Sequence, residues 1–154
     1  MEFEAGNNKL DMVVQSLRSV VEELGAAATV LCQKHLDMVM DGNKSRTWDE
    51  KSTLFAQTRV RGNGLTITWY EISWYGSKAA QTRRMSKTLI PRQKKDYGYN
   101  MDVLLKHARS WESDTVKEIE PQLRAIRRRA TFISKAIAQL NYAAKSEAKE
   151  VGNG

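Results

Sequence analysis

The side chains that could perform acid–base, metal or nucleophilic chemistry are few in this sequence, and they stand far apart. His35 and His107 have no cysteine or aspartate cluster at metal-ligand spacing beside them. The single cysteine, Cys32, has no basic neighbour closer than Lys34 to activate its thiol. We therefore expect both histidines on helix surfaces or boundaries, a buried thiol at Cys32, and no metal site.

The carboxylates and glycines also have simpler explanations than catalysis. The pair Glu22–Glu23 and the residues Glu118 and Glu120 lie in charge-rich helical stretches, where we expect them on solvated faces. The Gly-Asn-Gly stretch at 62–64 stands between strand-like runs, so it predicts a hairpin rather than a phosphate-binding loop. We expect neither enzyme activity nor a cofactor.

The positive charge of the chain is concentrated in its middle third. The net charge is +7 overall, but residues 57–95 carry +8, against −3 for residues 1–56 and +2 for residues 96–154. A surface charged only for solubility would spread its cations, so this concentration indicates a polyanionic partner. The candidate DNA-binding residues of this segment are Arg59, Arg61, Lys78, Arg83, Arg84, Lys87, Arg92, Lys94 and Lys95.

Aromatic residues are interleaved with these cations, at Trp69, Tyr70, Trp74 and Tyr75. A two- or three-stranded ribbon fits the major groove of duplex DNA and can present arginines to guanine edges. Alternatively, aromatics among cations stack unpaired bases, or the tryptophans are core and the cations only protect exposed strand edges. We expect Trp69 and Trp74 in the core and the cations on phosphates.

A second basic cluster lies in the C-terminal third of the chain. Its candidate DNA contacts are Arg124, Arg127 and Arg128, and helical spacing of three and four places them beside an apolar seam. The alternative is a coiled-coil flank whose arginines pair with acids of the first helix, such as Glu22 and Glu23. Both interpretations stay open at this point.

Two long helical stretches must position these cations. Over residues 9–41, apolar residues recur at alternating steps of four and three, the repeat of a supercoiled helical seam. The same spacing recurs over residues 100–147, but its phase slips beside Pro121. We expect either one helix kinked at Pro121 or two helices that meet there.

Between the helices, residues 57–90 have the period-two pattern of a basic antiparallel β-segment. After Tyr70 the apolar positions shift to Ile72 and Trp74, as a bulge near Tyr70–Glu71 would produce. A third strand is expected within residues 83–90. Such a small sheet is stable only if a helix covers its apolar face.

The fold predicted from these patterns is α+β: long heptad-patterned helices packed as a coiled-coil-like unit, with a small antiparallel three-stranded β-sheet. We expect a single domain over residues 1–154, whose 41% of apolar residues can form a real core. The sequence has no apolar stretch long enough to span a membrane, and its lone cysteine fits a reducing compartment. The first 15 residues lack the basic start and apolar run of a secretory signal, so we expect no leader. We therefore expect a cytoplasmic protein with no membrane partner.

The order of long helix, basic hairpin and C-terminal helices resembles the MobI-like auxiliary proteins of conjugative elements. The likeness spans about residues 57–130 and is carried by the Glu-Ile-Ser-Trp-Tyr stretch at 71–75, by Trp111–Glu112 and by Ile126–Arg127. It implies a non-enzymatic protein that binds the origin of transfer and helps the relaxase begin DNA transfer. No individual DNA contact is carried over from the resemblance.

Duplex DNA at the origin of transfer is thus the expected partner, with a relaxase as a second one. The long heptad stripes also offer a surface for a homodimer. Two rival functions use the same residues: a protein-interaction adaptor that binds through its long helices, and an RNA-binding protein that uses the same cations and aromatics.

Overall fold

The computed structural model describes residues 2–93 and 95–152, and it has the α+β class expected from the sequence. Helix α1 begins at Glu2 rather than residue 9, and strand β1 begins at Leu54 rather than residue 57. In chain order the elements are α1 (Glu2–Asn43), the 3-10 helix η1 (Trp48–Glu50), β1 (Leu54–Arg61), β2 (Gly64–Tyr75), β3 (Arg84–Leu89), α2 (Met101–His107), the 3-10 helix η2 (Ser110–Glu112) and α3 (Ser113–Gly152).

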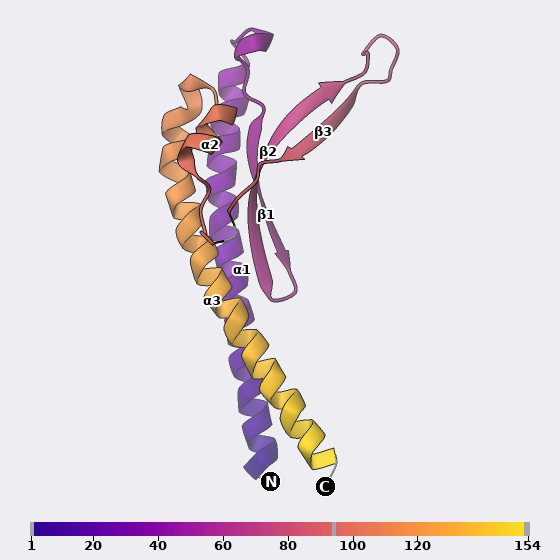
Figure 1. Ribbon diagram of the computed structural model, residues 1–154, viewed down its shortest axis with the longest axis vertical. Helices are drawn as coiled ribbons and strands as arrows, with labels where there is room; N and C mark the ends of the chain where they lie inside the picture. Colours follow the sequence, from indigo (N-terminus) through magenta and orange to yellow (C-terminus); the bar gives the residue numbers. More distant parts are fainter. Residues whose placement is uncertain (1, 94, 153–154) are drawn as a thin grey trace.

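Helices α1 and α3 lie side by side and run in opposite directions, and the sheet packs along the pair (Figure 1). The approach of β1 to α1 is close at Gly25, where an added Cβ would lie 2.8 Å from Val60 Cγ2. Over residues 2–93 and 95–152, the helices lack the combination of length and apolarity that a membrane crossing needs.

The three strands form one antiparallel sheet in the order β1-β2-β3. The predicted hairpin is confirmed: Arg61 pairs with Gly64, and the chain turns at Gly62 and Asn63. Gly62 has a φ of 59°, which glycine adopts without strain. Arg18 Nε donates a hydrogen bond of 2.8 Å to Asn63 Oδ1, and this bond holds the turn against α1.

Strand β2 is continuous, and the predicted bulge at Tyr70–Glu71 is wrong. Both neighbouring strands pair with β2 in uninterrupted register, β1 up to Glu71 and β3 from Tyr70 onwards. Because side chains alternate along an unbroken strand, Trp69 and Trp74 point to opposite faces. Trp69 is 0% exposed, as the core prediction requires, whereas Trp74 is 48% exposed. The prediction that Trp74 is core is wrong.

The end of β2 and the start of β3 leave the body of the protein as a two-stranded arm, residues 73–88 (Figure 1). Every residue from 73 to 85 is exposed. The tip of the arm turns at Gly76, whose φ is 85° and where an added Cβ would collide with the carbonyl of Thr82. The loop is closed by a 3.0 Å hydrogen bond that Thr82 N donates to the Ser77 carbonyl. Both faces of this arm are open to a partner.

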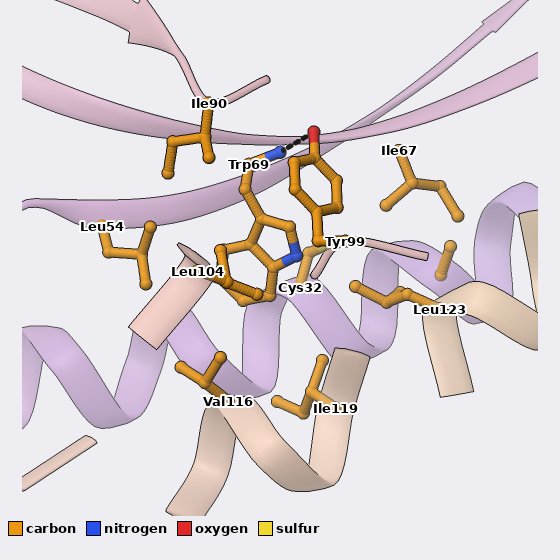
Figure 2. Close-up of a cluster of buried hydrophobic side chains, with 11 residues drawn as sticks. Cys32, Leu54, Ile67, Trp69, Ile90, Tyr99, Leu104, Val116, Ile119 and Leu123 are labelled. Carbon is orange, nitrogen blue, oxygen red and sulfur yellow. Dashed lines mark hydrogen bonds between the residues drawn. The ribbon is translucent and has the colours of Figure 1, made fainter. Parts of the chain in front are cut away.

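The core lies between the helices and the face of the sheet that carries Trp69 (Figure 2). Tyr99 Oη accepts a 3.1 Å hydrogen bond from the backbone N–H of Trp69, drawn dashed in Figure 2. Cys32 is buried in this cluster, as predicted. The fully buried members come from both long helices, the sheet and the connections: Ala28, Leu54, Ile67, Trp69, Ile90, Leu104, Val116, Ile119 and Leu123.

The C-terminal helical region breaks before Pro121 rather than at it. Helix α2 ends at His107, η2 follows, and α3 then runs without interruption through Pro121. Pro121 cannot donate to the carbonyl of Lys117, but both residues are exposed, so water can satisfy that carbonyl. Two helices meeting at Pro121 are therefore not observed.

Candidate nucleic-acid interface

One face of the sheet points away from Trp69 and the core, and we call it the outer face. Strand alternation and the register of the three strands define its members. None of these residues is acidic, and three of them are cations. The outer face consists of Phe55, Gln57, Arg59, Arg61, Thr66, Thr68, Tyr70, Ile72, Trp74, Met85, Lys87 and Leu89.

One cation on this face, Lys87, lies over aromatic rings. Lys87 Nζ is 5.5 Å from the ring centroid of Phe55 and 5.7 Å from that of Tyr70, and it donates a 3.4 Å hydrogen bond to Gln57 Oε1. The rings of Phe55 and Tyr70 stack on each other, with centroids 5.3 Å apart. Such contacts hold a long side chain in place while its charge remains exposed.

Arg83, which directly follows the loop at the tip of the arm, forms a second cation–aromatic group. Its guanidinium carbon lies 4.8 Å from the ring centroid of Trp74 and 5.5 Å from that of Trp48. Trp48 comes from η1, so two elements that are distant in sequence meet at one arginine. Sequence reasoning grouped Arg83 with Trp74 and missed Trp48.

The cations of the outer face and the arm have no carboxylate partner. Within residues 2–93 and 95–152, the ion pairs that form involve other residues than Arg59, Arg61, Lys78, Arg83, Arg84 and Lys87. All six are exposed. Arg84 shares the opposite face of the arm with Tyr75, and Lys78 lies in the loop at its tip. The structure thus gathers half of the twelve predicted residues on one sheet and its arm.

Most of the other predicted cations lie elsewhere on the surface. Arg92 and Arg124 both approach Asp96, Arg92 through the backbone carbonyl and Arg124 through a 2.9 Å ion pair. Hydrogen bonds from the Gly98 N–H and from Arg124 lower the pKa of the exposed Asp96 carboxyl. Lys95 is exposed beside it, and Lys94 lies outside the described residues.

Two arginines of the second cluster have different environments. Arg128 is exposed on α3, with its guanidinium carbon 5.5 Å from the ring centroid of Phe132. Arg127 is only 4% exposed, and its guanidinium donates to Glu120 Oε1 at 2.8 Å and to the Ile67 carbonyl at 2.9 Å. Because these internal acceptors hold the Arg127 guanidinium inside the protein, we leave Arg127 out of the candidate interface.

Glu120 is the centre of a buried polar cluster, and the prediction that it lies on a solvated face is wrong. Its carboxylate is 1% exposed and also accepts hydrogen bonds from Trp69 Nε1 at 2.9 Å and from the Tyr99 N–H at 3.1 Å. A buried carboxylate persists when paired and hydrogen-bonded in this way. The signal in the sequence is that Glu120 stands beside Ile119 on the apolar stripe, with Arg127 two helical turns later.

The histidines are also held by carboxylates. His35 is fully buried, which corrects the expected surface or boundary position, and its Nε2 lies 3.0 Å from Glu112 Oε1. His107 Nδ1 lies 3.0 Å from Glu71 Oε2 in a half-exposed pair. In the described part of the chain, no three histidine, cysteine or carboxylate side chains gather as metal ligands do. The geometry is that of structural pairs between elements.

Comparison with known proteins adds one finding to this geometry. A protein-family model described as MobI protein matches residues 24–141. The matched range includes the whole sheet, the arm, the C-terminal part of α1 and most of α3. Neither the curated proteins nor the solved structures contain a significant match.

Proposed function

The chain belongs to the MobI protein family, whose members are mobilization-related accessory proteins, and on that premise we propose that it binds DNA at the origin of transfer of a conjugative element. In this role it assists recruitment of the relaxase in the cytoplasm. It contributes binding rather than catalysis, and it needs no cofactor.

The observation that carries the proposal is the cationic outer face without an acidic member. Arg59, Arg61 and Lys87 lie on that face, and Arg83 borders it. Cations of this kind bind DNA phosphates and release condensed counterions, which supplies affinity for a polyanion. Aromatic neighbours keep Lys87 and Arg83 in place before DNA arrives, so less side-chain entropy is lost on binding.

The arm favours duplex DNA as the form that is bound. A two-stranded antiparallel ribbon has the dimensions to enter the major groove. Residues 73–85 are exposed on both faces. The arm can therefore enter a groove without any rearrangement of the protein. In this arrangement, Arg84 and Lys78 contact the phosphates that border the groove.

Arg124 and Arg128 on α3 supply a second phosphate contact in this proposal, together with Arg92 and Lys95 nearby. Arg124 and Arg128 line a shallow depression with Phe132, on the helix side of the sheet. A DNA duplex bound on the outer face would have to bend or continue past the body to reach them. This contact is therefore secondary to the sheet.

The proposed assembly is a homodimer that forms through the heptad stripes of the long helices. Support comes from the N-terminal part of α1, where Met12, Val13 and Val20 are 69%, 47% and 36% exposed. An exposed apolar stripe of this kind is typical of an interaction surface. Two-fold symmetry would present two outer faces to two DNA half-sites.

Binding to a labelled origin-of-transfer duplex, measured by fluorescence anisotropy at several salt concentrations, tests the proposal. If about five phosphates are neutralised, log K falls with log salt at a slope of about −4 to −5. Replacing Arg59 and Arg61 by alanine should reduce that slope by about 2. The matched control replaces two exposed cations at the far end of α3, Lys145 and Lys149, and should leave the slope unchanged.

Three outcomes would contradict all or part of the proposal. A slope near zero, or no binding at low salt, removes nucleic acid as the partner and favours the adaptor function. Equal affinity for a duplex RNA of the same sequence favours the RNA-binding alternative. Equal affinity for a shuffled DNA duplex would retain DNA binding but remove the origin of transfer as its specific site.

A further inference from the structure

An apolar groove of about 560 Å³ opens between the C-terminal end of α1, η1 and the base of the arm. Its apolar walls include Leu36, Met40, Trp48, Phe55, Ile72 and Trp74. We propose that this groove takes one unstacked nucleobase from the bound DNA, with the indoles of Trp48 and Trp74 as stacking surfaces. This inference rests on the proposed function and deepens it, because it assigns a locally unpaired nucleotide as part of the ligand.

The two tryptophans are more exposed than packing alone explains. Trp48 is 62% and Trp74 is 48% exposed, although tryptophan is among the most buried residue types on average. They come from different elements, yet both rings lie within 5.5 Å of the Arg83 guanidinium carbon. A planar cation therefore already rests against these ring faces, and a planar base can stack there in the same manner.

The groove exists before a ligand arrives, because hydrogen bonds hold its rim. Trp111 Nε1 donates to the Glu50 carbonyl at 2.8 Å, which fixes η1 to the C-terminal region. Asn43 exchanges two hydrogen bonds with the backbone of Ser52, at 2.8 and 3.1 Å. A site formed in advance avoids the entropy of ordering on binding.

The charges at the groove favour a nucleotide over an apolar peptide. Lys51 and Arg109 line it, against one acidic lining residue, Asp49. Arg83 stands at its border and can pair with the phosphate of the nucleotide whose base is bound. Phe55, Ile72 and Trp74 also belong to the outer face, so the groove continues directly from the surface on which the DNA backbone is proposed to lie.

Two labelled duplexes test this inference with the full chain: a fully paired duplex, and the same duplex with one unpaired 2-aminopurine. The protein should bind the second about tenfold more tightly, the gain expected from stacking one base, and should quench the 2-aminopurine emission. Trp74→Ala and Trp48→Ala should each abolish most of the quenching and most of the preference, measured as the ratio of the two affinities. Affinity for the paired duplex should fall to a smaller extent, because Arg83 loses an aromatic contact. Trp74→Phe should restore much of the quenching and of the preference.

The control is Tyr142→Ala, which removes an aromatic that is 71% exposed near the end of α3 and should change neither measurement. If the protein binds the paired duplex in a salt-dependent way but shows no preference for the unpaired base, this inference fails and the proposed function stands. If it binds neither duplex, the proposed function fails as well. If the preference for the unpaired base persists in both alanine variants, the inference is wrong. The groove would then be a site for a protein partner.

Discussion

The two halves of β2 differ in what surrounds them, although they belong to one strand. In the first half, the Trp69 indole donates to Glu120 and packs edge-on against His35, with ring centroids 5.1 Å apart. In the second half, Trp74 contacts Arg83 and remains half exposed. The same residue type is core at one position and surface five residues later, because Trp69 points toward the helices, whereas Trp74 points to the other face of β2, where the strand extends past them.

The largest expected difference is between alanine substitutions of these two tryptophans. Trp69→Ala should lower the free energy of unfolding by about 4–5 kcal/mol, since it empties a fully buried aromatic site. It also removes the hydrogen bond that the indole donates to Glu120. Trp74→Ala should lower the free energy of unfolding by at most about 1 kcal/mol. Urea unfolding, monitored by circular dichroism, measures both changes. Equal losses of stability would contradict the conclusion that Trp69 is a core residue and Trp74 a surface residue.

The buried ion pair gives the next effect. Arg127→Leu leaves the Glu120 carboxylate without its charged partner and should destabilise the protein by about 3 kcal/mol. We expect the lower end of the usual range because Trp69 and the Tyr99 N–H still donate to the carboxylate. The double variant Arg127→Leu with Glu120→Leu should recover much of the loss. Thermal melts decide the matter, and an Arg127→Leu protein as stable as the parent would show that the pair is dispensable.

The cations of the arm should behave in the opposite way. Replacing Arg83 and Arg84 by alanine should change the free energy of unfolding by less than about 0.5 kcal/mol, since both are exposed. The same change should weaken binding to duplex DNA by about tenfold at moderate salt, through lost phosphate contacts. Anisotropy and melting measured on one preparation separate the two effects. An unfolded double variant would assign these arginines to the structure.

The smallest expected effect is the loss of stability at alkaline pH, which arises from the core around the first half of β2. Burial raises the pKa of the Cys32 thiol and of the Tyr99 phenol above their ordinary values. Groups of this kind stabilise the fold fully below their unfolded pKa values and lose that contribution as pH rises. The unfolded thiol ionises from about pH 8.5, so the melting temperature should fall as the pH rises above that value. A Cys32→Ala variant should fall less, and an identical decline in it would remove Cys32 as a cause.

Periodicity in the sequence predicted much of the fold. The long helices, the hairpin at 62–64, the third strand and the antiparallel order all follow from local patterns, and the structure has each of them. Trp69 was placed in the core for the same reason. These features depend on residues that are close together in the sequence, and such local patterns can be read from a single sequence.

The errors concern contacts between distant residues. A bulge was inferred from the shift of apolar residues to Ile72 and Trp74, but that shift marks the point where β2 leaves the helices and presents its apolar residues on the other face. Glu120 and His35 are buried, contrary to expectation, because residues distant in sequence hold them: Trp69 donates to Glu120, and Glu112 lies 3.0 Å from His35. Trp48 joined the candidate site only through folding, from a stretch that sequence reasoning treated as a connection.

The continuity of β2 gives the arm a mechanical role. Between Gly64 and the turn at Gly76 the strand has no glycine, no proline and no break in its pairing, so the base of the arm lacks a hinge. A torque applied to the arm by a bent or twisting DNA would be transmitted along the backbone to Trp69 and, through Glu120, to α3. The arm therefore continues the core strand without a hinge, and its direction relative to the body is set where β2 packs against the two long helices.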